Sequence, residues 1–253
     1  HFFQGLSMDR SLYVAMTGAT QMMRAQSEVA HNLANADTIG FKAQLSAFQP
    51  LAVQGPGMPT RINGVAQGLG VDTREGGQVE TGRVLDVAVQ GQGWIAVQGA
   101  DGSEGYTRAG ELRLTPEGLL TDARGNLVLG DGGPISVPQS AQMNIGADGT
   151  VSVVPMGQGP ETIAAVGRIK LVNPAAGQLA LGSDGLMHLS DGGTAEADPA
   201  ATLKSGVLES SNVDPAQTLV QMIQLSRQYE LQIRAIRSAD ENAQSASRLL
   251  QMT

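Results

Sequence analysis

The sequence predicts a mainly β middle domain between two terminal helices, and these helices together form an α-helical, coiled-coil-like domain. At both ends of the chain, apolar residues recur at alternating steps of three and four, which is the spacing of a helical seam. Between the ends, apolar and polar residues alternate and glycine is frequent, with 33 in the 253-residue chain. Such a pattern is typical of short antiparallel strands joined by tight turns. We therefore expect a glycine-rich antiparallel β body and a separate helical domain.

The N-terminal segment predicts one long helix. Residues 1–7 resemble the remnant of an expression tag, so we take Met8 as the native start. We assign residues 8–40 to the N-terminal helix and its closing turn, with Asp9 as the N-cap. The large apolar positions of this first seam are Leu12, Met16, Met23 and Leu33.

A turn and an extended segment follow the helix. Asn35 tolerates left-handed backbone and Gly40 permits a positive φ, so both indicate a backbone turn rather than a ligand contact. Residues 41–67 contain several prolines and glycines, which predicts an extended connector with room for one hairpin.

The body is expected over residues 68–204. Three windows, 112–120, 143–151 and 179–187, share one form: an alternating strand, an acidic residue followed by glycine, and a returning strand. An Asp-Gly pair between apolar alternations predicts a hairpin whose two turn positions both accept φ > 0. We expect these hairpins to let the body fold on its own.

Residues 205–253 predict the C-terminal helix. Asp214 is the expected N-cap, Pro215 the first helical residue, and Gln217 the residue that completes a capping box. Two seams at opposite ends of one chain need partners, which are either each other within one domain or neighbouring chains. The second seam contains Leu219, Met222, Tyr229, Ile233 and Ile236.

The composition argues against several classes of partner. The formal net charge is -8 and no cluster of Lys or Arg occurs, which argues against nucleic acid and anionic membrane surfaces as partners. No run of about 18 apolar residues predicts membrane insertion, and no secretory signal peptide opens the chain. Without cysteine, disulfides and thiol catalysis are excluded.

No pattern predicts an active site or a cofactor. His31 and His188 stand apart and lack metal-ligand spacing. The glycines of residues 91–93 precede a strand, whereas a dinucleotide loop opens a helix. The Asp-Gly-Gly loops at 131–133 and 191–193 lack the alternate carboxylates of a calcium site. We therefore expect no enzyme activity, no metal and no cofactor.

Three separated motifs resemble one known family. Leu33–Lys42 is similar to the N-terminal signature of the flagellar rod, hook and hook-associated axial proteins. Thr81–Trp94, followed by Tyr106–Gly110, resembles their middle-domain signature, and Gly206–Asp214 resembles the entry to their terminal helix. Within that family the two chain ends are most similar to the proximal-rod members.

The resemblance implies a structural subunit of the bacterial flagellar basal-body proximal rod. Such a subunit polymerises through its terminal helices with copies of itself and other rod proteins, transmits torque and encloses the export channel. It is exported through the flagellar export apparatus without a cleaved signal, and it resides in the periplasm-spanning rod. The expected assembly interface is therefore the two seams, while Asn35 and Gly40 form the backbone turn.

Two other functions stay open. The chain could be a distal-rod or hook subunit of the same family. From a different class, it could be a glycan-binding or hydrolytic β domain with helical oligomerisation arms. A saccharide site needs aromatic platforms in a groove, and the body offers only Trp94 and Tyr106 for that purpose.

Overall fold

The computed structural model describes residues 5–52, 62–157, 159 and 162–251. Its chain divides into two compact units, here called the helical unit and the β unit. The helical unit comprises His1–Ala34, Gln44–Leu69 and Asp214–Thr253, and the β unit comprises Asn35–Ala43 and Gly70–Val213. The chain therefore passes between the units four times. The expected β middle domain between an N-terminal and a C-terminal helix is confirmed.

Parts of four expected segments lie outside the described residues. They are residues 1–4 of the expected tag remnant, residues 53–61 of the expected connector, residues 158, 160 and 161 of the expected body, and residues 252–253 of the expected C-terminal helix.

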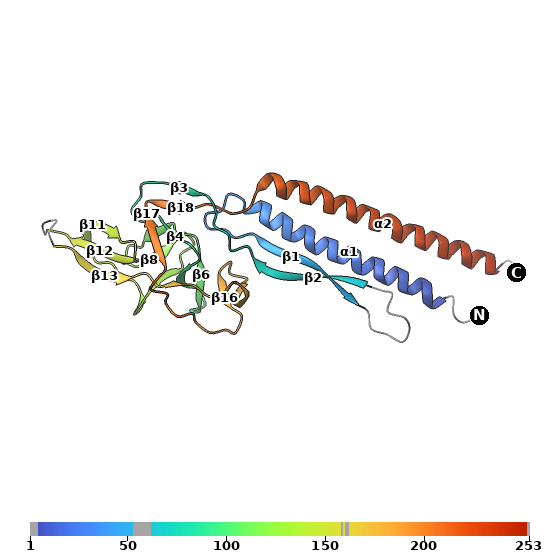
Figure 1. The fold of residues 1–253 in the computed structure, drawn as a ribbon, viewed down its shortest axis with the longest axis horizontal. Coiled ribbons are helices and arrows are strands. Elements are labelled where there is room, and N and C mark those ends of the chain that lie inside the picture. Colours follow the sequence, from blue (N-terminus) through green and yellow to red (C-terminus); the bar gives the residue numbers. More distant parts are fainter. Residues whose placement is uncertain (1–4, 53–61, 158, 160–161, 252–253) are drawn as a thin grey trace. The chain divides into compact units, whose positions relative to one another are not determined.

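The helical unit contains two long helices and one hairpin. Helices α1 (Gly5–Ala34) and α2 (Pro215–Gln251) lie side by side and run in opposite directions (Figure 1). Strands β1 (Gln44–Ala52) and β2 (Ile62–Val71) pair with each other, and β1 packs against α1. The segment predicted as an extended connector thus contributes a hairpin to the helical unit.

One expected helix boundary is wrong and another is confirmed. Helix α1 already begins at Gly5, so Asp9 lies inside it and cannot be its N-cap. No proline or glycine separates Gly5 from Asp9, so nothing interrupts the helix there. At α2, Asp214 Oδ1 accepts hydrogen bonds from the backbone N–H groups of Ala216 (2.9 Å) and Gln217 (3.2 Å), which makes Asp214 the N-cap.

The largest sheet of the β unit has nine strands, seven of which form its main path. From one edge to the other these seven are β15 (Leu179–Leu181), β16 (Met187–Leu189), β6 (Glu104–Thr107), β5 (Trp94–Gln98), β9 (Leu127–Gly130), β8 (Leu120–Asp122) and β7 (Leu112–Leu114). The remaining two are β10 (Gly133–Pro134), which pairs with β9, and β14 (Leu171–Val172), which pairs with β5.

Three smaller sheets and one short helix complete the described part of the β unit. The first sheet joins β11 (Ser140–Ile145), β12 (Thr150–Pro155) and β13 (Ala164–Arg168). The others pair β17 (Thr202–Ser205) with β4 (Val87–Gln90) and β18 (Val207–Glu209) with β3 (Gln78–Glu80). The helix is the 3-10 turn η1 (Ala176–Gln178).

The core of the β unit lies on both faces of β5. Ile95 and Val97 point into one apolar cluster, whereas Trp94 and Ala96 point into the other. Because successive side chains of a strand project to opposite faces, a strand that is apolar at every position is covered on both sides. The first cluster is completed mainly by Val, Leu and Ile side chains of β4, β7, β8, β9 and β12.

All three predicted hairpins are present, but their turns differ from the expected type. β7 pairs with β8, β11 with β12, and β15 with β16. In the described part of the chain only glycines have a positive φ, among them Gly118 (85°), Gly149 (84°) and Gly185 (79°). The acidic residue keeps a negative φ, and Asp148 and Asp184 instead accept a backbone N–H two residues on.

Candidate functional site

The exposed face of α1 carries a regular stripe. Six α1 residues spaced by alternating steps of four and three are all exposed, and Met16 and Met23 retain 56% and 57% of their accessible surface. Large apolar side chains exposed at heptad spacing are typical of a surface that a further helix covers. The six residues of this α1 stripe are Met16, Thr20, Met23, Ser27, Ala30 and Ala34.

A different face of α1 packs against α2. Gln21 and Ala25, which lie on the same side of the helix as Gly18, are buried, whereas the buried Ala19 lies on the side of Met23 and Ala30. At Gly18 a Cβ atom would lie only 2.7 Å from Nε2 of Gln232 on α2, so the side chain of Gln232 lies directly against Gly18. Of the predicted N-terminal seam, Met16 and Met23 are exposed. Leu33 is half-buried, and the side chain of Leu12 lies outside the described part.

The predicted C-terminal seam contains both half-buried and exposed residues. Met222, Tyr229, Ile233 and Ile236 are half-buried and share the α2 face of Gln232, whereas Leu219 is exposed. Three further large apolar side chains on α2 are more than half exposed. They are Val220 (54%), Ile223 (53%) and Leu231 (63%).

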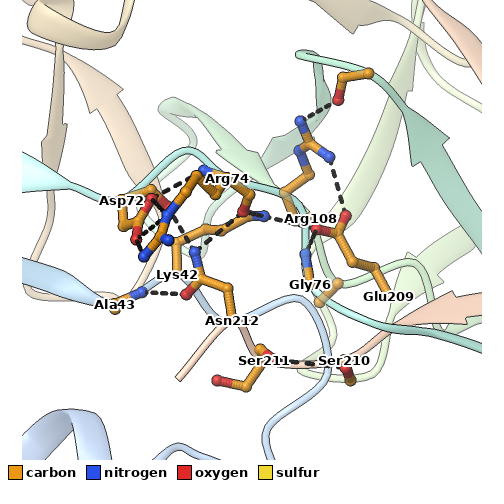
Figure 2. A network of polar contacts seen from close by, with 12 residues as sticks. Lys42, Ala43, Asp72, Arg74, Gly76, Arg108, Glu209, Ser210, Ser211 and Asn212 are labelled. Carbon is orange, nitrogen blue, oxygen red and sulfur yellow. Dashed lines mark hydrogen bonds and ion pairs between the residues drawn. The ribbon is translucent and has the colours of Figure 1, made fainter. Parts of the chain in front are cut away.

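A buried ionic cluster lies in the β unit (Figure 2). Glu209 at the end of β18 is 2% exposed. Its Oε1 accepts hydrogen bonds from Lys42 Nζ (2.6 Å) and the backbone N–H of Gly76 (2.8 Å). Its Oε2 accepts one from Arg108 Nη1 (2.9 Å). Arg108, 1% exposed, also lies over the ring of Trp94, with 5.5 Å from its Cζ to the ring centroid.

Two carboxylates face the cations of this cluster. Glu209 pairs with Lys42 and Arg108, and Asp72, which is 7% exposed, binds the guanidinium of the exposed Arg74. Burial alone would raise the pKa of Glu209, but the hydrogen bonds of Lys42 and Gly76 and the two nearby cations lower the pKa instead. Burial lowers the pKa of Lys42, and Glu209 offsets only part of that effect. The carboxylate is therefore firmly ionised at neutral pH.

The predicted turn lies against this cluster. The backbone N–H of Thr38 donates to Asn35 O (3.1 Å), and that of Gly40 donates to Glu209 O (2.7 Å). Gly40 has a φ of 66°, and a Cβ atom there would lie 2.3 Å from the backbone nitrogen of Ala109. The position thus needs glycine both for its conformation and for the close approach.

The residues considered above for metal or sugar binding have the following surroundings. The described residues contain no group of three or more His, Cys, Asp or Glu that could hold a metal ion. His188 bonds to the backbone oxygen of Glu104 and to Asp184, each at 3.0 Å. Trp94 and Tyr106 are 5% and 1% exposed, so neither can act as an aromatic platform for a sugar. None of the described helices is long and apolar enough to cross a membrane.

Known families match three regions of the chain. Residues 12–42 match the flagella basal body rod protein family, and residues 88–153 match the D1 domain of the flagellar hook protein FlgE/F/G. Residues 204–249 match the C-terminal domain of the flagellar basal body rod FlgEFG proteins.

Full-length relatives agree. The flagellar basal-body rod protein FlgF of Escherichia coli (strain K12) is 44% identical over 97% of this chain and 100% of its own length. The chain belongs to the flagellar basal-body rod protein family. FlgF of Caulobacter vibrioides is 32% identical over 94% of this chain and 97% of its own. FlgG of Bacillus subtilis (strain 168) is also 32% identical, over 92% and 96%.

Membership in the rod family gives the chain a structural function. It is a structural rod subunit of the flagellar basal body, and it assembles there with other rod proteins. Its relatives are structural proteins as well, not known enzymes.

The ionic cluster joins the three sequence motifs that carry the family resemblance. Lys42 ends the first motif, Arg108 lies in the second and Glu209 in the third. Sequence reasoning did not single out these three residues. A signal was present, since each is a charged residue in a motif that is otherwise mostly apolar, small or neutral.

Proposed function

We propose that this chain is a subunit of the proximal rod, and that it polymerises through its terminal helices to build a drive shaft that transmits torque and encloses the export channel. The observation that carries the proposal is the row of exposed large apolar side chains on the helix pair: Met16 and Met23 of the α1 stripe together with Leu219, Val220, Ile223 and Leu231 of α2. Burying an apolar side chain of this size contributes about 1.5 to 3 kcal/mol, so an uncovered row favours association. The occupant is a neighbouring rod subunit.

Contacts of this kind suit a rod. A helical tube needs heterologous contacts that continue from one subunit to the next and never close. The helix pair offers two distinct outer surfaces, one on α1 and one on α2. Residues of the predicted seams that face the partner helix, such as Tyr229, Ile233 and Ile236, would hold the pair together while the outer residues bind neighbours.

Substitutions on two faces of α2 test the proposal. Ile223→Asp changes the outer face, where the carboxylate stays hydrated in the free chain but is buried in the rod. We expect normal thermal unfolding of the purified protein together with loss of rod assembly and motility. The matched control is Gln221→Asp, which adds the same charge at another exposed position of α2. Normal motility with Ile223→Asp would rule out this surface as the interface.

Ile233→Asp tests the inner face. Ile233 is half-buried on the α2 face toward α1, so the substitution should also weaken the helix pair in the free chain. An early loss of helical circular dichroism on heating, with the β unit unchanged, is the expected result. Assembly without any such loss would show that Ile233 supports neither the pair nor the interface.

The position along the rod needs its own test. Gold-labelled antibody on purified basal bodies should mark the proximal rod if the proposal is correct. Label on the distal rod or the hook would instead support the alternative within the family. Export through the flagellar apparatus without cleavage is tested by the intact N-terminus of chain recovered from basal bodies.

A further inference from the structure

The polar cluster of the β unit includes one neutral residue whose contacts differ from those of the ions. Asn212 lies two residues before Asp214, the N-cap of α2. Its side-chain oxygen accepts a hydrogen bond from the backbone N–H of Ala43 (2.8 Å). Its amide nitrogen donates to the backbone oxygens of Asp72 (2.9 Å) and Arg74 (3.0 Å), as Figure 2 shows.

These contacts join three parts of the sequence. Ala43 is the last residue of the first segment of the β unit, Asp72 lies two residues after the chain re-enters that unit, and Asn212 lies one residue before the chain leaves it again. Backbone bonds from Asp72 N to Ala43 O (2.7 Å) and from Asn212 N to Phe41 O (3.3 Å) run between the same segments. Three of the four chain crossings are therefore held together on the β-unit side.

The chemistry requires an amide at this position. An asparagine side chain offers an acceptor and two donors, and here it uses all of these functions on backbone groups. A carboxylate of the same shape keeps the acceptor but loses both donors and faces two carbonyl oxygens. The buried pair of Lys42 and Glu209 connects the same three segments, since Lys42 Nζ donates both to Glu209 Oε1 and to Arg74 O (2.5 Å).

We propose that Asn212 is a positioning residue that fixes the register of the three segments through which the chain enters and leaves the β unit, so that torque passes through them as one block. The part that concerns torque rests on the proposed function as a rod subunit. The part that concerns register does not, because it is a property of the free chain.

Hydrogen exchange on the full-length purified protein tests the register. In Asn212→Ala we expect the Ala43 amide and the amides of 72–76 to exchange about tenfold faster or more, while those of β5 and β6 stay unchanged. In Asn212→Asp the Ala43 amide should keep its protection while 72–76 lose theirs, because only the donors are missing. A residue that merely fills space would not produce this split.

The matched control is Asn126→Ala. Asn126 is also partly buried and bonds through its side chain to Asp122 (2.8 Å), but within a single hairpin. It should leave the exchange of Ala43 and 72–76 unchanged. Uniform loosening of the whole β unit in Asn212→Ala, or equal effects of the Ala and Asp variants on both segments, would overturn the proposal.

Swimming under increased viscosity tests the transmission of torque. Cells with Asn212→Ala should swim in dilute medium but lose motility in viscous medium at a lower viscosity than cells with Asn126→Ala. Equal performance of the two strains would overturn the part that concerns torque. Failure of the proposed function is a separate result, since it would appear as label on the distal rod or the hook and would leave the hydrogen exchange of the free chain as described.

Discussion

At the scale of single residues, we expect the free energy of unfolding of the β unit to depend strongly on Glu209. Removing one partner of a buried ion pair leaves an uncompensated charge, which costs far more than the loss of a surface pair. Glu209 serves two cations, and Arg108 Nε already has no hydrogen-bond partner among the described residues. The cluster therefore has no spare acceptor to replace the carboxylate.

Glu209→Gln should lower the free energy of unfolding by about 3 to 5 kcal/mol at neutral pH, because Lys42 and Arg108 stay buried without their carboxylate. Chemical denaturation of the purified protein measures the loss. Glu111→Gln is the control, since Glu111 pairs with the exposed Arg113 and its loss should have little effect. Similar midpoints for both variants would show that the cluster does not stabilise the fold.

The same carboxylate predicts how stability changes in acid. The pKa of Glu209 is lower in the folded chain than its ordinary value of 4.5. Its contribution is therefore complete above pH 4.5 and is lost as the pH falls through the folded value. Wild type should lose more stability below that pH than Glu209→Gln does. Both proteins should still lose some stability in acid through Asp72, because the hydrogen bond from Arg74 lowers the pKa of that carboxyl as well.

A comparison of Gly40 with Gly82 separates the cost of a positive φ from the cost of a clash with neighbouring backbone. Gly40 and Gly82 have nearly the same φ, 66° and 70°, but only Gly40 lies against other backbone. Gly82→Ala should cost about 1 to 2 kcal/mol for the left-handed conformation alone. Gly40→Ala should cost clearly more, because its Cβ would meet Ala109 and Arg108. Equal unfolding free energies would mean that the turn can shift away from Arg108 and Ala109 at no cost. Gly40→Val should in addition impair motility.

At the scale of elements, local signals placed the start of α2 and the three hairpins correctly, but they misplaced the start of α1. A cap works where the preceding backbone leaves the helical conformation. At α2, Pro215 and the extended segment before it impose that change. At α1, nothing between Gly5 and Asp9 imposes it, so the acidic side chain alone could not set the boundary.

Asp214→Ala should lower the stability of α2 by about 0.5 to 2 kcal/mol, since the N–H groups of Ala216 and Gln217 lose their acceptor. The loss should appear as faster hydrogen exchange in the first turn of α2, with no change in β5. Asp214→Asn, which retains an acceptor oxygen, should restore most of the protection. No difference between Ala and Asn would mean that the carboxylate does not act as a cap.

At the scale of the whole molecule, the β unit is assembled from segments far apart in the sequence. The predicted body, residues 68–204, contains both apolar clusters but lacks Lys42, Glu209 and strand β18, which pairs with β3. In that fragment, Arg108 would be buried without its carboxylate. One continuous segment thus supplies both apolar clusters, whereas the ionic cluster also needs residues from outside that segment.

A fragment of residues 68–204 should therefore fold cooperatively but melt at a lower temperature than a fragment that includes 35–43 and 70–213, joined by a short linker. Scanning calorimetry compares the two, and Glu209→Gln in the longer fragment is the control. The variant should remove most of the difference between the fragments. Equal melting temperatures would show that the added segments do not stabilise the β unit.

The sequence by itself determined the two terminal helices, the N-cap at Asp214 and the hairpins, because each depends on residues that are close together in the chain. The family resemblance was also readable there, because each of its motifs is a continuous stretch of residues. Only the tertiary structure decided which stripe of each helix faces its partner, since Met16 and Ile233 fit the same periodicity but differ in burial. The structure also brought Glu209 to Lys42 and Arg108, which lie 167 and 101 positions away. A charged residue needs a partner only where the fold buries it, and both its burial and its partner are decided by the packing of the strands.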